Sequence, residues 1–138
     1  MKILAHGIDL VDFARIKKMV KTHKDRFLDR VFTNSEQKYA DRNKNRIEKL
    51  AGRFAAKEAI LKLLGTGWRG KIKWTDIEVV NNSSGRPVVK LTGEVKEIAN
   101  KMGIKQISIS ITHTANFAIA SAVALAEQNN HEDTKARR

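Results

Sequence analysis

The spacing of apolar residues along the chain changes from a helical period of about four to a strand period of two, which predicts an α+β fold. Residues 3–11 are apolar at both alternating sets of positions, so we expect a strand that is covered on both faces and central in its sheet. The first half of the chain is predicted to form a strand over 3–11, a helix capped by Asp12, a helix to about Arg42 that opens with the capping box Thr33-Asn34-Ser35-Glu36, and a long helix over 45–65 ended by Gly65. The second half is predicted to form a hairpin of strands over 74–80 and 87–92, a helix over 93–102, and a final antiparallel pair joined by 113–116.

These elements predict an antiparallel sheet packed against a long central helix. The chain has 138 residues, of which 41% are hydrophobic, and this is enough for one domain with its own core. We place this single domain at 1–127. We expect 128–138 to be a flexible tail, because this segment mixes both signs of charge with polar residues.

A glutamate lies within the apolar stripe of the long helix. At 100° per residue, the apolar residues of 45–65 gather on one face, and Glu58 lies near the centre of that face. An ionised carboxylate buried without a partner costs several kcal/mol or more, so the chain must supply a cation, hydrogen bonds or a metal. Asp9 interrupts the apolar strand over 3–11 in the same way.

Two interpretations of these carboxylates are open at this point. If the strand packs on the helix, Asp9 and Glu58 converge on one hard cation. Mg²⁺ fits best, because it takes one or two protein carboxylates together with oxygens of a substrate phosphate. Alternatively, Glu58 pairs with Lys62 one turn later and Asp9 caps a local group. Spacing alone supports both about equally, and the helical phase of Glu58 favours the metal site.

Basic residues and glycines near Glu58 indicate where a phosphate would bind. Arg53, Lys57 and Lys62 lie around Glu58 on the helix, where they would neutralise charge that builds on a leaving phosphate. Helical lysines are, however, more often simply solvated. Gly65-Thr66-Gly67 could turn backbone N–H groups toward a phosphate, but no Gly-Lys-Ser/Thr follows it, and a helix cap explains it more simply.

Several kinds of chemistry are excluded by what the sequence lacks. The chain has no cysteine, and its four histidines show no zinc-ligand spacing. His113, at the predicted hairpin tip, could still donate to a phosphate, although an isolated turn histidine is more often structural. Without a cysteine or a Gly-x-Ser-x-Gly motif, covalent catalysis has little support, and we expect a direct transfer.

The net charge of +12 predicts a partner that is acidic or rich in phosphate. The basic residues are spread along the chain, and one tyrosine and two tryptophans offer little surface for stacking bases. We therefore favour an acidic protein or a phosphate-rich small molecule over nucleic acid. A basic nucleic-acid-binding module without catalytic function is the alternative. The absence of cysteine, of a signal peptide and of a run of ~20 apolar residues predicts a soluble, cytoplasmic protein with no membrane partner.

The chain resembles the bacterial holo-[acyl-carrier-protein] synthases, which are small 4′-phosphopantetheinyl transferases. The Lys57-Glu58-Ala59 helix with its upstream aspartate is the specific part of this resemblance. Many members carry Gly-x-Gly-x-Asp where this chain has Ala5-His6-Gly7-Ile8-Asp9, so the first glycine is missing. The matching segments extend over almost the whole chain: Gly7-Ile8-Asp9 with Arg15, Phe32-Thr33 with Glu36, Arg53 to Ala59 with Lys62, Gly65-Thr66-Gly67, Gly85-Arg86-Pro87, and Ser108 to Thr114.

This resemblance implies that the protein moves the 4′-phosphopantetheine group of coenzyme A onto a serine of acyl carrier protein, releases adenosine 3′,5′-bisphosphate and supports fatty acid biosynthesis. Asp9 and Glu58 match the Mg²⁺ ligands, and the serine proton would pass to Glu58 or to a water on the metal. Lys62 would hold the transferred phosphate. The cofactor-binding residues would be Arg53, Lys57, Gly65, Thr66, Gly67, Arg86, Pro87, His113 and Thr114. The acidic carrier protein would contact Arg15, Lys18, Lys21 and Arg26.

The resemblance also implies a homotrimer, because the small members of this family hold the cofactor between neighbouring subunits. A domain of this length has little room for a whole coenzyme A cleft, which agrees with a site shared by two copies. A structural trimeric scaffold without catalytic activity is the remaining alternative.

Overall fold

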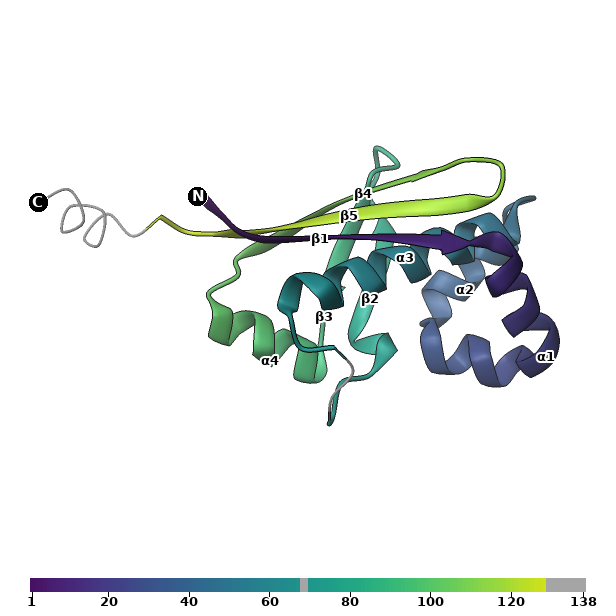
Figure 1. The fold of residues 1–138 in the computed structure, drawn as a ribbon, viewed down its shortest axis with the longest axis horizontal. Coiled ribbons are helices and arrows are strands. Elements are labelled where there is room, and N and C mark those ends of the chain that lie inside the picture. Colours follow the sequence, from purple (N-terminus) through teal and green to yellow (C-terminus); the bar gives the residue numbers. More distant parts are fainter. Residues whose placement is uncertain (68–69, 129–138) are drawn as a thin grey trace, which may run out of the picture.

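A long helix, α3 (Arg46–Leu64), packs against one face of a three-stranded antiparallel sheet (Figure 1). The structure is a computed structural model that describes residues 1–67 and 70–128. The other elements are β1 (Lys2–Asp12), α1 (Phe13–Val31), α2 (Asn34–Asp41), the 3-10 helix η1 (Trp74–Asp76), β2 (Ile77–Asn81), β3 (Pro87–Leu91), α4 (Gly93–Met102), β4 (Gln106–His113) and β5 (Phe117–Ala126). The main sheet has the order β1-β5-β4, and β2 and β3 form a separate hairpin.

Small side chains allow α3 to lie close to this sheet. Every second residue of β5 is a buried alanine, and these are Ala118, Ala120, Ala122, Ala124 and Ala126. On α3 itself, every residue from Leu50 to Leu64 is buried except Glu58 and Lys62. This part of α3 is therefore a core helix, and within it only the charged residues Glu58 and Lys62 reach the surface. The expectation that Glu58 lies at the centre of a buried stripe is wrong, because Glu58 is only half-buried.

β1 is an edge strand, whereas its sequence predicted a central one. It pairs with β5 in antiparallel register, from Lys2 opposite Ala126 to Asp12 opposite Phe117. The predicted position rested on apolar residues at both sets of alternating positions. In the structure α3 covers one set, while residues of the other set are exposed, as Ile8 shows with 59% of its surface accessible.

Gly7 brings the backbone of β1 into contact with the backbone of α3. A Cβ atom added at Gly7 would lie 2.1 Å from the carbonyl oxygen of Ala59 and 2.9 Å from the amide nitrogen of Leu63. Glycine in a strand commonly marks such a close approach. Asp9 lies two residues further along the strand and Glu58 one residue before Ala59, so this contact sets the distance between the two carboxylates.

The predicted helix ends are confirmed. The backbone N–H of Thr33 donates to Glu36 Oε1 at 2.9 Å and that of Glu36 to Thr33 Oγ1 at 3.3 Å, which is the capping box. Gly65 ends α3 in the left-handed conformation (φ 74°), and its N–H bonds to the carbonyl of Leu61. The predicted α+β order of elements is also present.

One predicted boundary is wrong, because the strand expected over 74–80 begins at Ile77, after the 3-10 turn η1. Asp76 holds this turn: a carboxylate oxygen accepts from the N–H of Lys73 at 3.2 Å, and its carbonyl accepts from the N–H of Thr92 at 2.8 Å. The tail expected over 128–138 lies, apart from Gln128, outside the described residues. None of the helices found in 1–67 and 70–128 combines the length and apolar character of a transmembrane span.

We expect Gly7→Ala to lower the free energy of unfolding by about 2–4 kcal/mol, because the added methyl group overlaps backbone atoms of α3 that cannot rotate away. Urea unfolding would measure this. Gly52→Ala is the matched control: its Cβ meets one side-chain methyl group, Cγ2 of Ile111 at 3.0 Å, and no backbone atom, and alanine favours the helix, so we expect a change within about 1 kcal/mol. Equal stabilities for the two variants would contradict the contact at Gly7.

Candidate active site

Asp9, Glu58 and Lys62 form a charged cluster where β1 crosses α3. The ammonium of Lys62 donates to Asp9 Oδ1 at 2.7 Å and to the carbonyl of Ile8 at 3.2 Å. This ion pair joins helix to strand, in place of the pair between Lys62 and Glu58 within the helix that was the alternative. The hydrogen bond to Asp9 and the charge of Asp9 raise the pKa of Lys62.

The two carboxylates are close enough to affect each other. Partial burial and then the negative charge of Asp9 raise the pKa of Glu58, while Arg15 and Lys62 oppose this rise. A divalent cation would relieve the repulsion. Two carboxylates that leave most positions to water and ligand oxygens suit Mg²⁺. No group of three or more His, Cys, Asp or Glu side chains able to hold a metal occurs within 1–67 and 70–128. These residues therefore do not offer a metal site with three or more such side-chain ligands.

A second cluster surrounds Arg53, on another side of α3. Arg53 is 4% exposed, donates from Nη2 to Asn81 Oδ1 at 2.6 Å and lies 3.9 Å from the ring centre of Tyr39. Its Nε is buried and has no hydrogen-bond partner among the described residues. Burial lowers the pKa of Arg53, but a guanidinium keeps its charge in proteins. An unsatisfied donor on a buried cation is well suited to an anion.

Arg53 opens on a pocket of about 150 Å³. His113, at the end of β4, also lines this pocket; its Nε2 lies 2.9 Å from Glu48 Oε1 and its Nδ1 lies 3.2 Å from the carbonyl oxygen of Thr114. The pocket is lined by Tyr39, Glu48, Lys49, Gly52, Arg53, Asn81, Pro87, Ile111, His113 and Ala118. The structure thus brings together three of the proposed cofactor-binding residues, and none of Asp9, Glu58 and Lys62 lines this pocket.

The other proposed cofactor-binding residues lie apart from this pocket. Lys57 was expected at the edge of the stripe, but its side chain is fully buried and its ammonium bonds to Glu36 at 2.7 Å, so we no longer assign it to the cofactor. The hydroxyl of Thr114 accepts from two N–H groups in its own turn. Arg86 is exposed in the β2–β3 turn. The segment Gly65-Thr66-Gly67 follows α3, with its first glycine acting as the helix cap.

The residues expected to contact the carrier protein lie on α1. Arg15, Lys18, Lys21 and Arg26 are all exposed. Arg15 also lies near the carboxylate cluster, because its guanidinium lies 5.2 Å from the ring centre of Phe54 and its charge acts on Glu58. This helix therefore connects a basic surface with the carboxylate cluster.

Four polar residues of the Arg53 pocket were not predicted from the sequence, namely Tyr39, Glu48, Lys49 and Asn81. Glu48 and Lys49 fall within the expected long helix, and Asn81 falls within an expected turn. None of them interrupts a hydrophobic pattern, which was the signal that identified Asp9 and Glu58. Only the fold brings α2, α3 and β2 together at this point.

We expect Asp9→Asn to lower the pKa of Glu58. The substitution removes the nearest negative charge and frees Lys62, and both changes favour the ionised carboxylate. A ¹³C NMR titration of glutamate-labelled protein without divalent cations would measure the pKa, with Glu58→Gln identifying the signal. An unchanged pKa in Asp9→Asn would show that the two carboxylates are not neighbours.

The chain is similar to proteins of one known family. A family model described as the 4′-phosphopantetheinyl transferase superfamily matches residues 5–122. The chain is 41% identical over 121 residues to the holo-[acyl-carrier-protein] synthase of Solibacter usitatus, covering 88% of this chain and 97% of that one. It is 43% identical over 124 residues to that of Caldanaerobacter subterraneus, covering 90% and 96%.

Solved structures show the same fold. The crystal structure of holo-[acyl-carrier-protein] synthase from Neisseria meningitidis matches with a TM-score of 0.82 at 29% identity, covering 90% of this chain and 99% of that one. The Helicobacter pylori enzyme in complex with coenzyme A matches with a TM-score of 0.77 at 36% identity, covering 87% and 99%. The predicted fold class and family are confirmed. The chain is an enzyme that belongs to the 4′-phosphopantetheinyl transferase superfamily.

Proposed function

We propose that the protein transfers the 4′-phosphopantetheine group of coenzyme A to a serine of apo acyl carrier protein. In this proposal the reaction needs Mg²⁺, releases adenosine 3′,5′-bisphosphate, and serves fatty acid biosynthesis in the cytoplasm. The observation that carries it is the pairing of Asp9 and Glu58 beside Lys62. The names of the curated relatives and the coenzyme A complex of the Helicobacter pylori enzyme support the substrates.

The cluster can perform a direct phosphoryl-type transfer. The serine oxygen bonds to the phosphorus that carries pantetheine, the bond from that phosphorus to the bridging oxygen breaks, and its electron pair leaves with adenosine 3′,5′-bisphosphate. Glu58 accepts the serine proton, and its raised pKa makes it a stronger base. Lys62 turns from Asp9 to the transferred phosphate. Bound Mg²⁺ would be held by Asp9 and Glu58 and would supply positive charge to the diphosphate.

Nucleotide binding is the proposed role of the Arg53 pocket. Arg53 and His113 line the pocket and supply positive charge and N–H groups for a phosphate, and Pro87 lies on its wall. The pocket holds about 150 Å³, which is smaller than the roughly 300–1,000 Å³ of sites for small molecules, so it can take only one end of coenzyme A.

We propose that the complete site lies between two subunits of a homotrimer. The carboxylate cluster and the Arg53 pocket are on different sides of α3 and share no lining residue, which agrees with one subunit providing the first and its neighbour the second. The uncovered face of β1 offers an interface, since Ile3, Leu4, Ile8 and Leu10 are 39–70% exposed. An apolar strip of this kind on an edge strand marks an association surface.

The positive charge suits an acidic carrier protein. Exposed lysines and arginines of α1 lie next to Arg15, so a partner bound there would present its serine near Glu58. Such a charged surface mainly speeds encounter and depends on salt.

The proposed activity is tested by incubating the protein with coenzyme A, Mg²⁺ and apo acyl carrier protein and measuring intact mass. We expect the mass of one phosphopantetheine to be added to the carrier. No mass shift, together with tight and salt-sensitive RNA binding, would instead support the nucleic-acid-binding alternative.

Glu58→Gln separates catalysis from structure. We expect a loss of turnover of about 100-fold or more. We also expect no loss of stability at neutral pH. Because the folded pKa of Glu58 is raised, its ionised form destabilises the fold above that pKa, and this penalty disappears as the pH falls below the unfolded value. Urea unfolding at two pH values would check the sign. A structural scaffold without catalytic activity would predict that Glu58→Gln and the unchanged protein give the same result in the transfer assay.

A shared site predicts that two inactive variants complement each other. Glu58→Gln damages the carboxylate cluster and His113→Ala the Arg53 pocket, so a mixed trimer contains some sites in which both halves are intact. We expect mixing and reassembly to restore part of the activity that neither variant has alone. Ile8→Glu should in turn give an inactive monomer in sedimentation. An active monomer would refute the shared site.

A further inference from the structure

One residue of α1, Lys24, has a backbone conformation that suits glycine. Its φ is 46° and its ψ is −127°, and these angles interrupt α1 with a kink. They are close to those of the second residue of a type II′ turn, a position where glycine is favoured because a Cβ atom is crowded there. Every other residue with positive φ in the described part of the chain is a glycine. Among the described residues, only Lys24 therefore holds a side chain in such a conformation.

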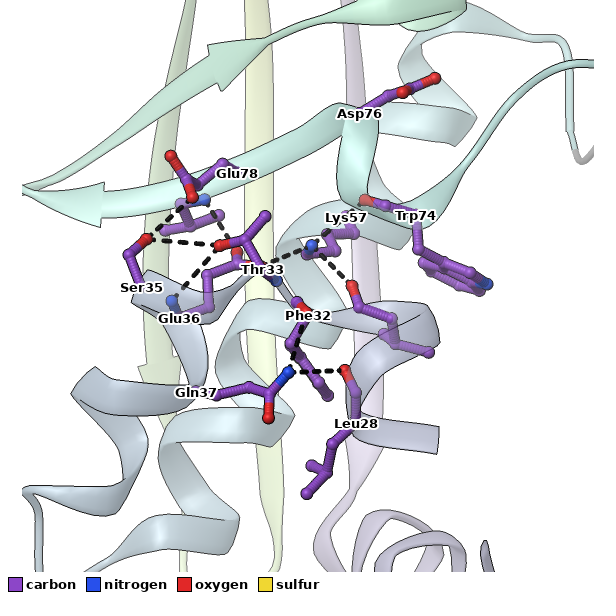
Figure 2. A network of polar contacts seen from close by, with 12 residues as sticks. Leu28, Phe32, Thr33, Ser35, Glu36, Gln37, Lys57, Trp74, Asp76 and Glu78 are labelled. Carbon is purple, nitrogen blue, oxygen red and sulfur yellow. Dashed lines mark hydrogen bonds and ion pairs between the residues drawn. The ribbon is translucent and has the colours of Figure 1, made fainter. Parts of the chain in front are cut away.

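Contacts at both ends of α1 impose this kink. At the start of the helix, the N–H of Phe13 donates to the carbonyl of Asn116 at 2.9 Å. Beyond the kink, Gln37 donates to the carbonyl of Leu28 at 3.2 Å, and Lys57 of α3 donates to the carbonyl of the last residue of α1 at 2.8 Å (Figure 2). A strained conformation persists where the surrounding structure determines it in this way.

The fold needs the kink but not the lysine side chain. Residues 21–26 are all exposed, so the kink forms an exposed corner of the protein. The ammonium of Lys24 takes part in none of the ion pairs within 1–67 and 70–128. Glycine would adopt the same angles without steric crowding, as it does at the other positions with positive φ. Lysine adds only an exposed positive charge at this corner.

The corner belongs to a strongly basic helix. α1 carries seven lysines and arginines and only two aspartates. Lys21 and Arg26, on either side of the kink, are exposed, and both are among the residues expected to contact the acidic carrier protein. Clustered charges of one sign attract a partner of the opposite sign and guide its encounter with the protein. A cation at position 24 extends this basic surface across the kink.

We propose that Lys24 is a further binding residue for the acidic carrier protein, and that its ammonium pairs with a carboxylate of this partner. The strain at Lys24 is then the cost of presenting a cation at the corner of α1, and functional sites commonly hold such strained residues. The inference rests on the proposed function for the identity of the partner. It does not depend on the transfer reaction, because binding and stability are measured without coenzyme A.

Three substitutions at position 24 separate the charge from the strain. Lys24→Gly removes both, Lys24→Met removes only the charge, and Lys24→Arg keeps both. Lys101→Met, near the end of α4 and exposed, is the control for a lysine charge lost elsewhere. We expect Lys24→Gly to raise Tm by about 2–6 °C, because relief of the strain exceeds the greater freedom of glycine in the unfolded chain. The other three variants should stay within about 2 °C of the unchanged protein.

The affinity for the partner is measured with labelled apo acyl carrier protein by fluorescence anisotropy. We expect Kd at low salt to rise roughly 2- to 5-fold for both Lys24→Gly and Lys24→Met, which is the range of an exposed ion pair. Lys24→Arg and Lys101→Met should keep the Kd of the unchanged protein. The difference should narrow as NaCl is raised toward about 1 M, because salt screens exposed charges.

A more stable Lys24→Gly variant with an unchanged Kd would overturn the proposal, since the strained lysine would then have no binding role. A Lys24→Gly variant no more stable than Lys24→Met would also overturn it, because there would be no strain to explain. An unchanged Kd with a raised KM for coenzyme A would assign Lys24 to a phosphate instead. If the unchanged protein binds the carrier protein but transfers nothing, the proposed reaction fails, while Kd still decides the role of Lys24. If it does not bind the carrier protein, both fail.

Discussion

The backbone contact between β1 and α3 at Gly7 is the constraint on which the site depends. A strand turns alternate side chains to the same face, so Asp9 points to the face on which Gly7 meets Ala59. Glu58 precedes Ala59 on the helix and therefore lies beside Asp9. Any side chain at position 7 would separate the two elements and, with them, the two carboxylates. The alanines of β5 allow the same close approach over the rest of the sheet.

The charges in the cluster of Asp9, Glu58 and Lys62 offset one another only in part. Two neighbouring carboxylates repel each other, and Lys62 and Arg15 offset part of this. Lys62 is 56% exposed, so it can leave Asp9 at a small desolvation cost when another cation takes its place. The same lysine can then serve a phosphate. Binding of a cation at Asp9 would therefore be coupled to the release of Lys62 from Asp9.

Asp9 and Glu58 were both selected as candidate site residues from the sequence, but the reason for selecting Glu58 is wrong. A carboxylate in an apolar helix pointed to Glu58, yet the structure places Lys57 in the core and Glu58 at the surface. Apolar residues on all sides of α3 left no clear polar face, so helical phase could not tell which charged residue was buried. Glu36 was correctly predicted as part of a capping box, but its second role as partner of Lys57 depends on α2 and α3 packing together.

Features that depend on contacts between segments far apart in the chain could not be predicted from the sequence either. The order β1-β5-β4 places the last strand in the centre, and no local pattern distinguishes this from a central β1. Tyr39, Glu48 and Asn81 follow ordinary helix and turn patterns, and they gain a role only where α2, α3 and β2 meet around Arg53. Local signals, such as the capping box and the glycine cap of α3, were predicted correctly because a few adjacent residues determine them.

Three features of the single chain are unfavourable for its stability, and in the proposed function each would be relieved by a different partner. The repulsion at Glu58 favours a cation, the free donor of Arg53 favours an anion, and the exposed apolar residues of β1 favour another copy. Whatever binds only the folded state stabilises it, so these partners and the fold support each other. Functional sites commonly retain such local costs. A chain that was optimised for stability alone would pair the arginine, separate the carboxylates and cover the strand, and it would lose each of these binding surfaces.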